Sequence, residues 1–135
     1  MRRTASVASV ILGLLLLVGG AATWVVVSRT LADQQIVTSD DACLPGRQVA
    51  DPFTAYCQAK VIEKHTLEAT DGFYYAELGR EDPRREVALT SSFLQASLFT
   101  SILAFGVAAM AMGMGVLFIL IGLGIRDVAR RTVVT

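Results

Sequence analysis

Two long stretches without charged side chains enclose a polar middle segment in this chain of 135 residues. The first stretch runs from Thr4 to Ser28 and the second from Val87 to Ile125, whereas residues 29–86 are rich in charge. An apolar run of about 20 residues is long enough for a helix to cross the hydrocarbon core of a bilayer. The pattern therefore predicts an all-α membrane protein in which two transmembrane helices form a hairpin.

The first stretch predicts a transmembrane helix over residues 7–27. The alternative is a cleaved signal peptide, with Arg2 and Arg3 as its basic end and Gly19-Gly20-Ala21 as its cleavage site. The apolar run continues to Val27, however, and the apolar core of a signal peptide is shorter, about 7–15 residues. We therefore expect an anchor that is not removed.

The second stretch predicts one long helix over residues 83–125. Asp82-Pro83 places a capping residue before a proline at the first helical position, and no Gly or Pro follows until Gly106. From Ile102 to Ile125 no side chain is polar, so residues 102–125 are expected to be its transmembrane part.

Arginines at both ends of the chain predict its orientation. Arg2 and Arg3 precede the first span, and Arg126, Arg130 and Arg131 follow the second. Because short flanks rich in Arg stay in the cytoplasm, residues 1–6 and 126–135 are expected to be cytoplasmic. The chain would then lie in the plasma membrane with residues 28–92 extracytoplasmic, of which residues 28–82 form a small cap.

The only two cysteines, Cys43 and Cys57, lie in this outer segment. Because exported compartments are oxidising, we expect the two thiols to form a disulfide rather than remain free. Asp51-Pro52 predicts a cap helix over residues 52–69, which we expect to pack through Phe53 and Tyr56.

Aromatic and basic residues of the outer segment are candidates for contact with lipid or a partner. Phe73, Tyr74 and Tyr75 could lie at the level of the lipid headgroups, or form the small core of the cap. Arg84 and Arg85 could bind lipid phosphates or carboxylates of a partner, or form solvated ion pairs with acidic neighbours.

Small residues recur along one face of each span. Such residues allow helix backbones to approach closely in lipid, so the simplest use is packing of the two spans against each other. Docking onto a larger membrane protein or onto a second copy is the alternative. The members of this predicted packing face are Ser9, Gly13, Gly20, Ala104, Ala108, Ala111, Gly115 and Gly122.

The sequence offers little chemistry. His65 is the only histidine, and on a helix it would share a face with Glu68 alone, so we expect no metal site, cofactor or catalytic residue. The formal net charge is zero, which gives no indication of nucleic-acid binding. Neither span contains an ionisable residue, which argues against an ion path made by this chain alone.

Six segments resemble a family of small two-span actinobacterial (mycobacterial-type) membrane proteins whose function is unknown. Members of that family often carry the label of aromatic ring-opening dioxygenase. Ring opening of this type uses iron held by two His and one carboxylate, whereas this chain has one His, so the resemblance implies no catalytic residues here. The segments are 24–33, 36–41, 64–72, 75–78, 80–84 and 92–101.

The function expected from these observations is a structural, interaction or accessory role, without enzymatic activity. The partners would be membrane lipids and either a larger membrane or envelope complex or further copies of the chain. A metal-dependent dioxygenase and a small homo-oligomeric channel are the alternatives.

Overall fold

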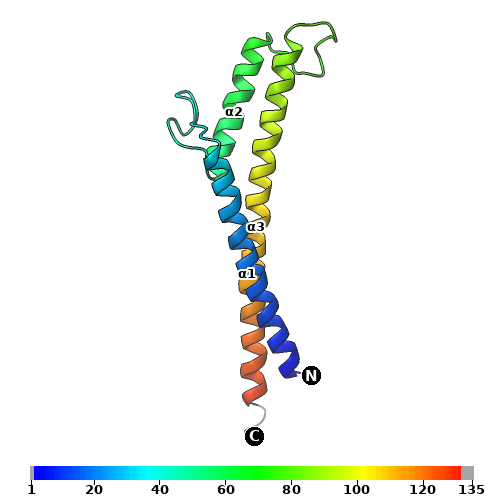
Figure 1. The fold of residues 1–135 in the computed structure, drawn as a ribbon. Helices are drawn as coiled ribbons and strands as arrows, with labels where there is room; N and C mark the ends of the chain where they lie inside the picture. The colour runs from blue at the N-terminus through cyan, green and yellow to red at the C-terminus, as the bar shows by residue number, and fades with distance from the viewer. Residues whose placement is uncertain (1, 132–135) are drawn as a thin grey trace. The chain divides into compact units, whose positions relative to one another are not determined.

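The computed structural model describes residues 2–131 and is helical, as the sequence predicts (Figure 1). Its helices are α1 (Arg2–Asp33), α2 (Pro52–Ala69) and α3 (Arg85–Arg131). The only β-type pairing within the described residues is an isolated antiparallel bridge between Val37 and Gln48. Residues 132–135, part of the expected cytoplasmic end, lie outside the described range.

The chain divides into two compact units. The first, here called the helix-pair unit, comprises residues 1–26 and 106–135, and the second, the cap unit, comprises residues 27–105. In the helix-pair unit, α1 and the C-terminal part of α3 lie side by side and run in opposite directions (Figure 1).

Two helices of the described chain, α1 and α3, are long and apolar enough to cross a membrane. Only 11% of the most apolar window of α1 and 17% of that of α3 are buried inside the protein. The core helix of a soluble protein would hide most of such a window. The apolar surface of these two helices is therefore left for another environment to cover.

The cap unit combines the end of α1, a loop, α2, a second loop and the first turns of α3. Its buried apolar residues come from all of these parts, so its small core joins segments that are far apart in the sequence. These residues are Leu31, Ala42, Val49, Ala55, Cys57, Ala59, Val61, Leu78, Ala88, Leu98 and Phe105.

Helix α2 occupies the range expected from the sequence, residues 52–69, and its start is fixed by Asp51. The Asp51 carboxylate accepts hydrogen bonds from the backbone N–H groups of Phe53 and Thr54, at 2.9 and 3.0 Å. The Thr54 hydroxyl in turn accepts a bond from the backbone N–H of Asp51, which completes a capping box.

The expectation that α2 packs through Phe53 and Tyr56 only is wrong, although the Tyr56 ring does contact Phe99. Phe53 is 75% exposed and Tyr56 is 48% exposed. The buried face of α2 consists mainly of small residues, Thr54, Ala55, Cys57 and Ala59, with Val61. The disulfide of Cys57 joins this face to the 36–49 loop.

The other two helices differ from their expected bounds. Helix α1 continues beyond the expected span to Asp33, and its last turn buries Leu31. Helix α3 begins at Arg85 rather than at Pro83, after a turn that is closed by the Arg85 backbone N–H donating to the Asp82 carbonyl oxygen at 3.0 Å. It continues past residue 125 to Arg131, since no Pro or capping Gly stops it.

Candidate interaction sites

Three pairs of small residues bring α1 and α3 together in the helix-pair unit. Gly13 lies opposite Gly115, Gly20 opposite Ala108, and the residue opposite Gly122 is Ser6. The pairs recur every seven residues on both helices, which keeps them on one seam of an antiparallel pair. All six residues are buried.

The four glycines of this seam leave no room for a side chain. A Cβ on Gly13 would lie 2.6 Å from the carbonyl oxygen of Gly115, and a Cβ on Gly115 would lie 2.6 Å from that of Gly13. A Cβ on Gly20 would be 2.7 Å from the Ala108 oxygen, and one on Gly122 would be 2.6 Å from Val10. Such distances are too short for carbon, so the close approach of the backbones depends on glycine.

Two serine hydroxyls cross the same seam. The Oγ atoms of Ser6 and Ser9 donate to the carbonyl oxygens of Gly122 and Phe118, each at 2.7 Å. Interhelical hydrogen bonds of this kind support helix pairs where water is absent. Ser6 was not included in the packing face expected from the sequence, although it precedes Gly13 by seven residues.

The predicted packing face is therefore used mainly within the chain. Gly13, Gly20, Ala108, Gly115 and Gly122 lie in the seam, and Ser9 and Ala111 are half-buried. Ala104 belongs to the cap unit and is also half-buried. The five seam residues of this face are covered by the facing helix.

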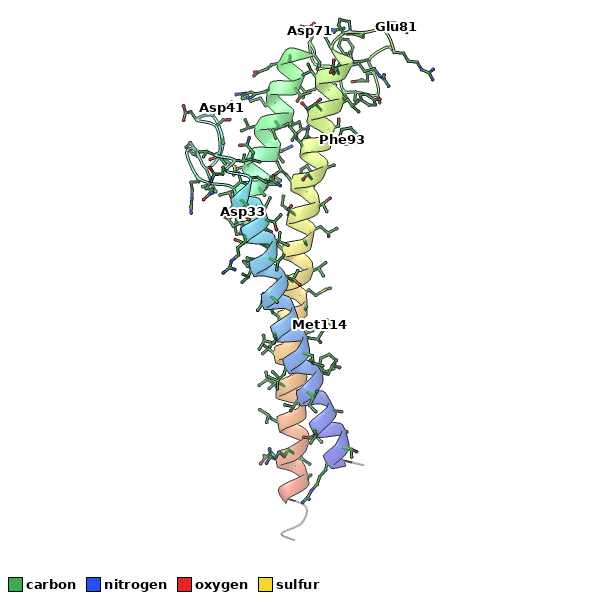
Figure 2. The ribbon with its side chains drawn as sticks, viewed as in Figure 1. Asp33, Asp41, Asp71, Glu81, Phe93 and Met114 are labelled. Atoms are coloured by element: carbon green, nitrogen blue, oxygen red, sulfur yellow. A yellow bond between two sulfur atoms is a disulfide. The ribbon has the colours of Figure 1, made fainter. Side chains whose placement is uncertain are left out.

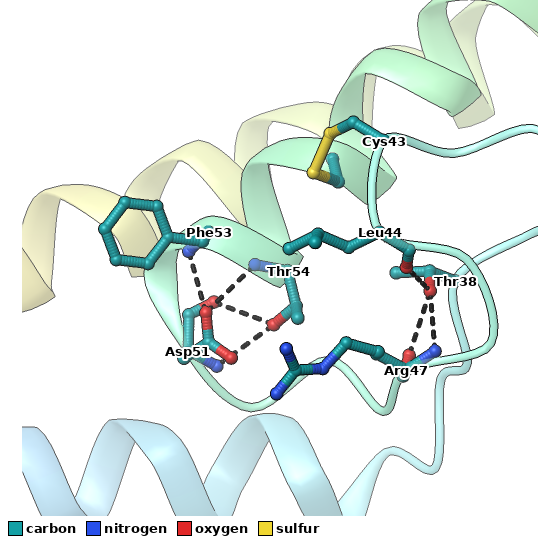
Figure 3. The surroundings of a disulfide bond; sticks show 8 residues. Thr38, Cys43, Leu44, Arg47, Asp51, Phe53 and Thr54 are labelled. Atoms are coloured by element: carbon teal, nitrogen blue, oxygen red, sulfur yellow. Dashed lines mark hydrogen bonds between the residues drawn. A yellow bond between two sulfur atoms is a disulfide. The ribbon is translucent and has the colours of Figure 1, made fainter.

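Cys43 and Cys57 are paired within the cap unit, with their Cα atoms 5.4 Å apart (Figure 3). The bond joins an exposed residue of the 36–49 loop to a buried residue of α2. The loop is closed a second time by the Thr38 hydroxyl, which donates to the carbonyl oxygen of Leu44 and accepts the backbone N–H of Arg47. Thr38 is 3% exposed, so this loop has a polar centre.

Asp41 makes a second link between this loop and α2. Its carboxylate accepts a hydrogen bond from Lys64 Nζ at 2.9 Å and lies 2.9 Å from His65 Nε2. Lys64, followed by His65, lowers the pKa of the Asp41 carboxyl from 3.8 to about 2. His65 thus contacts Asp41, a partner from another segment that helix periodicity could not indicate.

The 70–84 loop is organised around Arg84 and around Arg85, the first residue of α3. Arg84 contacts the carboxylates of Asp71 and Asp82, at 2.8 and 2.7 Å, and its guanidinium lies over the Phe73 ring. Through its side-chain and backbone N–H groups, Arg84 lowers the pKa of Asp82 to about 2.

Arg85 donates to the Leu78 carbonyl oxygen and lies 4.1 Å from the Tyr75 ring centroid. The N–H of Tyr74 donates to Glu77, and its hydroxyl contacts Glu63. All five residues expected to contact lipid or a partner, Phe73, Tyr74, Tyr75, Arg84 and Arg85, therefore have intramolecular partners.

No group of three or more His, Cys, Asp or Glu side chains within residues 2–131 could hold a metal ion. His65 has Asp41 beside it, and Glu68 lies 4.0 Å from Lys64 instead. A facial triad of two His and one carboxylate, as ring-opening iron chemistry requires, cannot be built from the single His of this chain.

The first turns of α3 carry an apolar surface at the start of the second uncharged stretch. Between Glu86 and Arg126 this helix has no charged side chain, yet Val87, Phe93 and Leu94 are 47–67% exposed in the cap unit. Phe93 projects away from α2 (Figure 2). The neighbouring α2 carries Lys60, Glu63, Lys64 and Glu68 on its outer face. The lack of charge from Val87 onwards was visible in the sequence, but not which side chains before residue 102 would lie exposed in the cap unit.

Comparisons with protein-family models, with curated proteins and with solved structures give no match to this chain.

Proposed function

We propose that this chain is an integral plasma-membrane protein with an accessory role, which docks through its cap unit onto a larger membrane or envelope complex. The membrane part of the proposal is supported by the exposed apolar windows of α1 and α3. Lipid acyl chains cover such apolar surfaces and keep them out of contact with water. The resemblance to small actinobacterial membrane proteins agrees with this assignment.

The orientation that we propose places the arginine-flanked ends in the cytoplasm and the cap unit outside. Arg2 and Arg3 lie before the first span, and Arg126, Arg130 and Arg131 lie after the second. A disulfide in the cap unit fits an oxidising exterior compartment. Cysteine labelling from either side of intact cells, with single cysteines placed at Ala5 and at Asp40 in a variant without Cys43 and Cys57, tests this orientation. Labelling of Asp40→Cys from inside would overturn it.

The observation that carries the accessory role is the uncharged, exposed face of α3 in the cap unit. A helix that faces water on one side carries charged residues there, whereas the exposed side chains of this face, Val87, Leu89, Phe93 and Leu94 with Thr90 among them, are all uncharged. The small-residue seam is already occupied by the helix pair. A protein partner that covers the 87–94 face would explain why it lacks charge.

A photo-activatable residue at position 93, compared with one at position 68, tests this role in native membranes. Phe93 is 67% exposed on the uncharged face, and Glu68 is exposed on the charged face of α2. We expect a reproducible protein adduct of defined mass from position 93 and none from position 68. Adducts with lipid only, or no adducts from either position, would contradict the accessory role.

A further inference from the structure

Two aromatic rings meet near the N-terminal end of α2, and a third lies one helical turn away. The rings of Tyr56 and Phe99 contact each other edge to face, with centroids 6.5 Å apart. Phe53 lies one turn before Tyr56 on the same side of α2 and is 75% exposed. Phe99 is itself 43% exposed, so the cluster is an aromatic surface rather than a core.

The position of Phe99 relates this cluster to the apolar part of α3. The run without polar side chains begins at Ile102, less than one turn after Phe99. Leu103 follows Phe99 by four residues, lies on the same face and is 67% exposed. The aromatic surface therefore continues directly into the apolar surface that we assign to lipid.

The end of the first uncharged stretch gives a second, independent marker. The hydroxyl of Ser28, the last residue before Arg29, donates to the carbonyl oxygen of Ala50 at 2.7 Å. Ala50 immediately precedes Asp51, the residue that caps α2. The first turn of α2, with Phe53, is thus held beside the point where the uncharged part of α1 ends.

Polarity along α2 changes in the order that a membrane interface requires. Phe53 comes first, Tyr56 adds a hydroxyl, and Lys60 follows one turn later with a side chain that is 51% exposed. Aromatic rings are favoured at the headgroup level, and Lys side chains reach from there into the phosphate layer.

The loop with Phe73, Tyr74 and Tyr75 lies too far from the start of the apolar run at Ile102 to reach the same headgroup layer. Arg85, whose guanidinium stacks on Tyr75, precedes Ile102 by 17 residues of continuous helix, about 25 Å at ~1.5 Å per residue. Headgroup layers are only about 5–8 Å thick, which follows from a bilayer of about 40–45 Å with a core of about 30 Å.

We infer that Phe53, Tyr56 and Phe99 form an interfacial anchor, inserted at the boundary between headgroups and acyl chains on the cap side of the bilayer. The occupant of this surface is the lipid itself. The inference rests on the proposed membrane insertion and replaces the Phe73–Tyr75 loop as the lipid contact of the cap unit.

Depth-dependent tryptophan quenching tests the anchor in the full chain. Trp24 is the only tryptophan, so Trp24→Phe provides a background into which single tryptophans are placed. Phe53→Trp and Phe99→Trp report on the anchor, Phe73→Trp on the distal loop, and Leu117→Trp, 59% exposed on α3, on membrane insertion. Each variant is reconstituted in phosphatidylcholine liposomes that contain lipids with a nitroxide near the headgroup.

For Phe53→Trp and Phe99→Trp we expect blue-shifted emission and at least about twofold stronger quenching by the shallow nitroxide than for Phe73→Trp, because only interfacial rings are within its reach. Phe73→Trp should instead be quenched by aqueous iodide. If all three behave alike while a deep nitroxide quenches Leu117→Trp, the anchor is wrong and membrane insertion stands. If Leu117→Trp is not quenched by the deep nitroxide, membrane insertion and the anchor both fail.

Discussion

Each of the two units of this protein is stabilised internally by a different kind of contact. The helix-pair unit relies on glycine seams and on serine hydroxyls that donate to backbone carbonyls. The cap unit relies on a disulfide, a capping box and ion pairs at Asp41 and Arg84. In the membrane that we propose, lipid would give two apolar helices no hydrophobic reason to associate, so close backbone packing would stabilise the pair. In water the hydrophobic effect acts, but a segment this small buries too little apolar surface and needs cross-links.

The aromatic residues provide a separate spectroscopic probe for each unit. Trp24, the only tryptophan, belongs to the helix-pair unit, whereas all three tyrosines, Tyr56, Tyr74 and Tyr75, belong to the cap unit. Unfolding in mild detergent can therefore be followed by Trp24 emission for one unit. Tyrosine emission in a Trp24→Phe variant follows the other.

The largest expected effect comes from removal of the disulfide. Replacing Cys43 and Cys57 together by Ser should destabilise the cap unit by about 3 kcal/mol, the loop-closure value for a loop of about 15 residues. Tyrosine emission should show an unfolding midpoint at lower denaturant concentration, while the Trp24 transition stays in place. A shift of both transitions by the same amount would show that the two units do not differ as described.

Substitution of the seam glycines should have the next largest effect, in the opposite unit. Gly115→Ala and Gly20→Ala should each destabilise the helix pair by about 1–3 kcal/mol, because the new Cβ overlaps backbone atoms of the facing helix. The Trp24 transition should shift and the tyrosine transition should not.

Two neighbouring glycines provide matched controls. Gly19 and Gly113 have no atoms within 4 Å of an added Cβ. Gly19→Ala and Gly113→Ala should be neutral or slightly stabilising, because Ala is the better helix former by up to about 1 kcal/mol. Equal losses for Gly113→Ala and Gly115→Ala would exclude the seam as the source of stability.

A smaller effect is expected from the cap of α2. Asp51→Ala removes the carboxylate that accepts two backbone N–H groups and should cost about 1 kcal/mol in the cap unit. Asp51→Asn should retain most of the stability, since Asn also caps. Tyrosine emission during chemical unfolding measures the stability of both variants. If Asp51→Ala leaves the stability of the cap unit unchanged, Pro52 alone fixes the helix start.

The smallest expected effect is a pH dependence confined to the cap unit. The pKa values of Asp41 and Asp82 are lowered from 3.8 to about 2 in the folded protein. Because the unfolded chain binds these protons first, the stabilisation is complete above pH 4 and is lost as the pH falls towards 2. Tyrosine emission should show this loss and Asp41→Asn should reduce it. The Trp24 transition should change less, since the uncharged stretches contain no carboxylates.

Helix starts that depend only on neighbouring residues could be predicted from local signals in the sequence. Asp51-Pro52 predicted the start of α2 because capping needs only the residues that follow. Asp82-Pro83 predicted a helix start two residues early, because the chain first makes a turn closed by the Arg85 backbone N–H and the Asp82 carbonyl oxygen.

Contacts between distant segments could not be predicted in this way. The buried face of α2 was misjudged because segments far away in the sequence cover it, although the Cys43–Cys57 bond that ties one of them to α2 was expected. The pairing of Asp41 with Lys64 and His65 depends on how that loop folds back. The heptad spacing of small residues was visible in each span, but not which residue faces which.

The seven-residue spacing of the small pairs restricts which changes in length the protein can tolerate. A single inserted residue between Gly13 and Gly20 would rotate one of these glycines about 100° off the seam, and a residue added to α3 between Ala108 and Gly115 would not restore it. Deleting seven residues from both helices at matching places would leave the remaining pairs in register. Homologous chains adapted to thinner or thicker bilayers should therefore differ by paired heptads, while the loops of the cap unit vary freely in length.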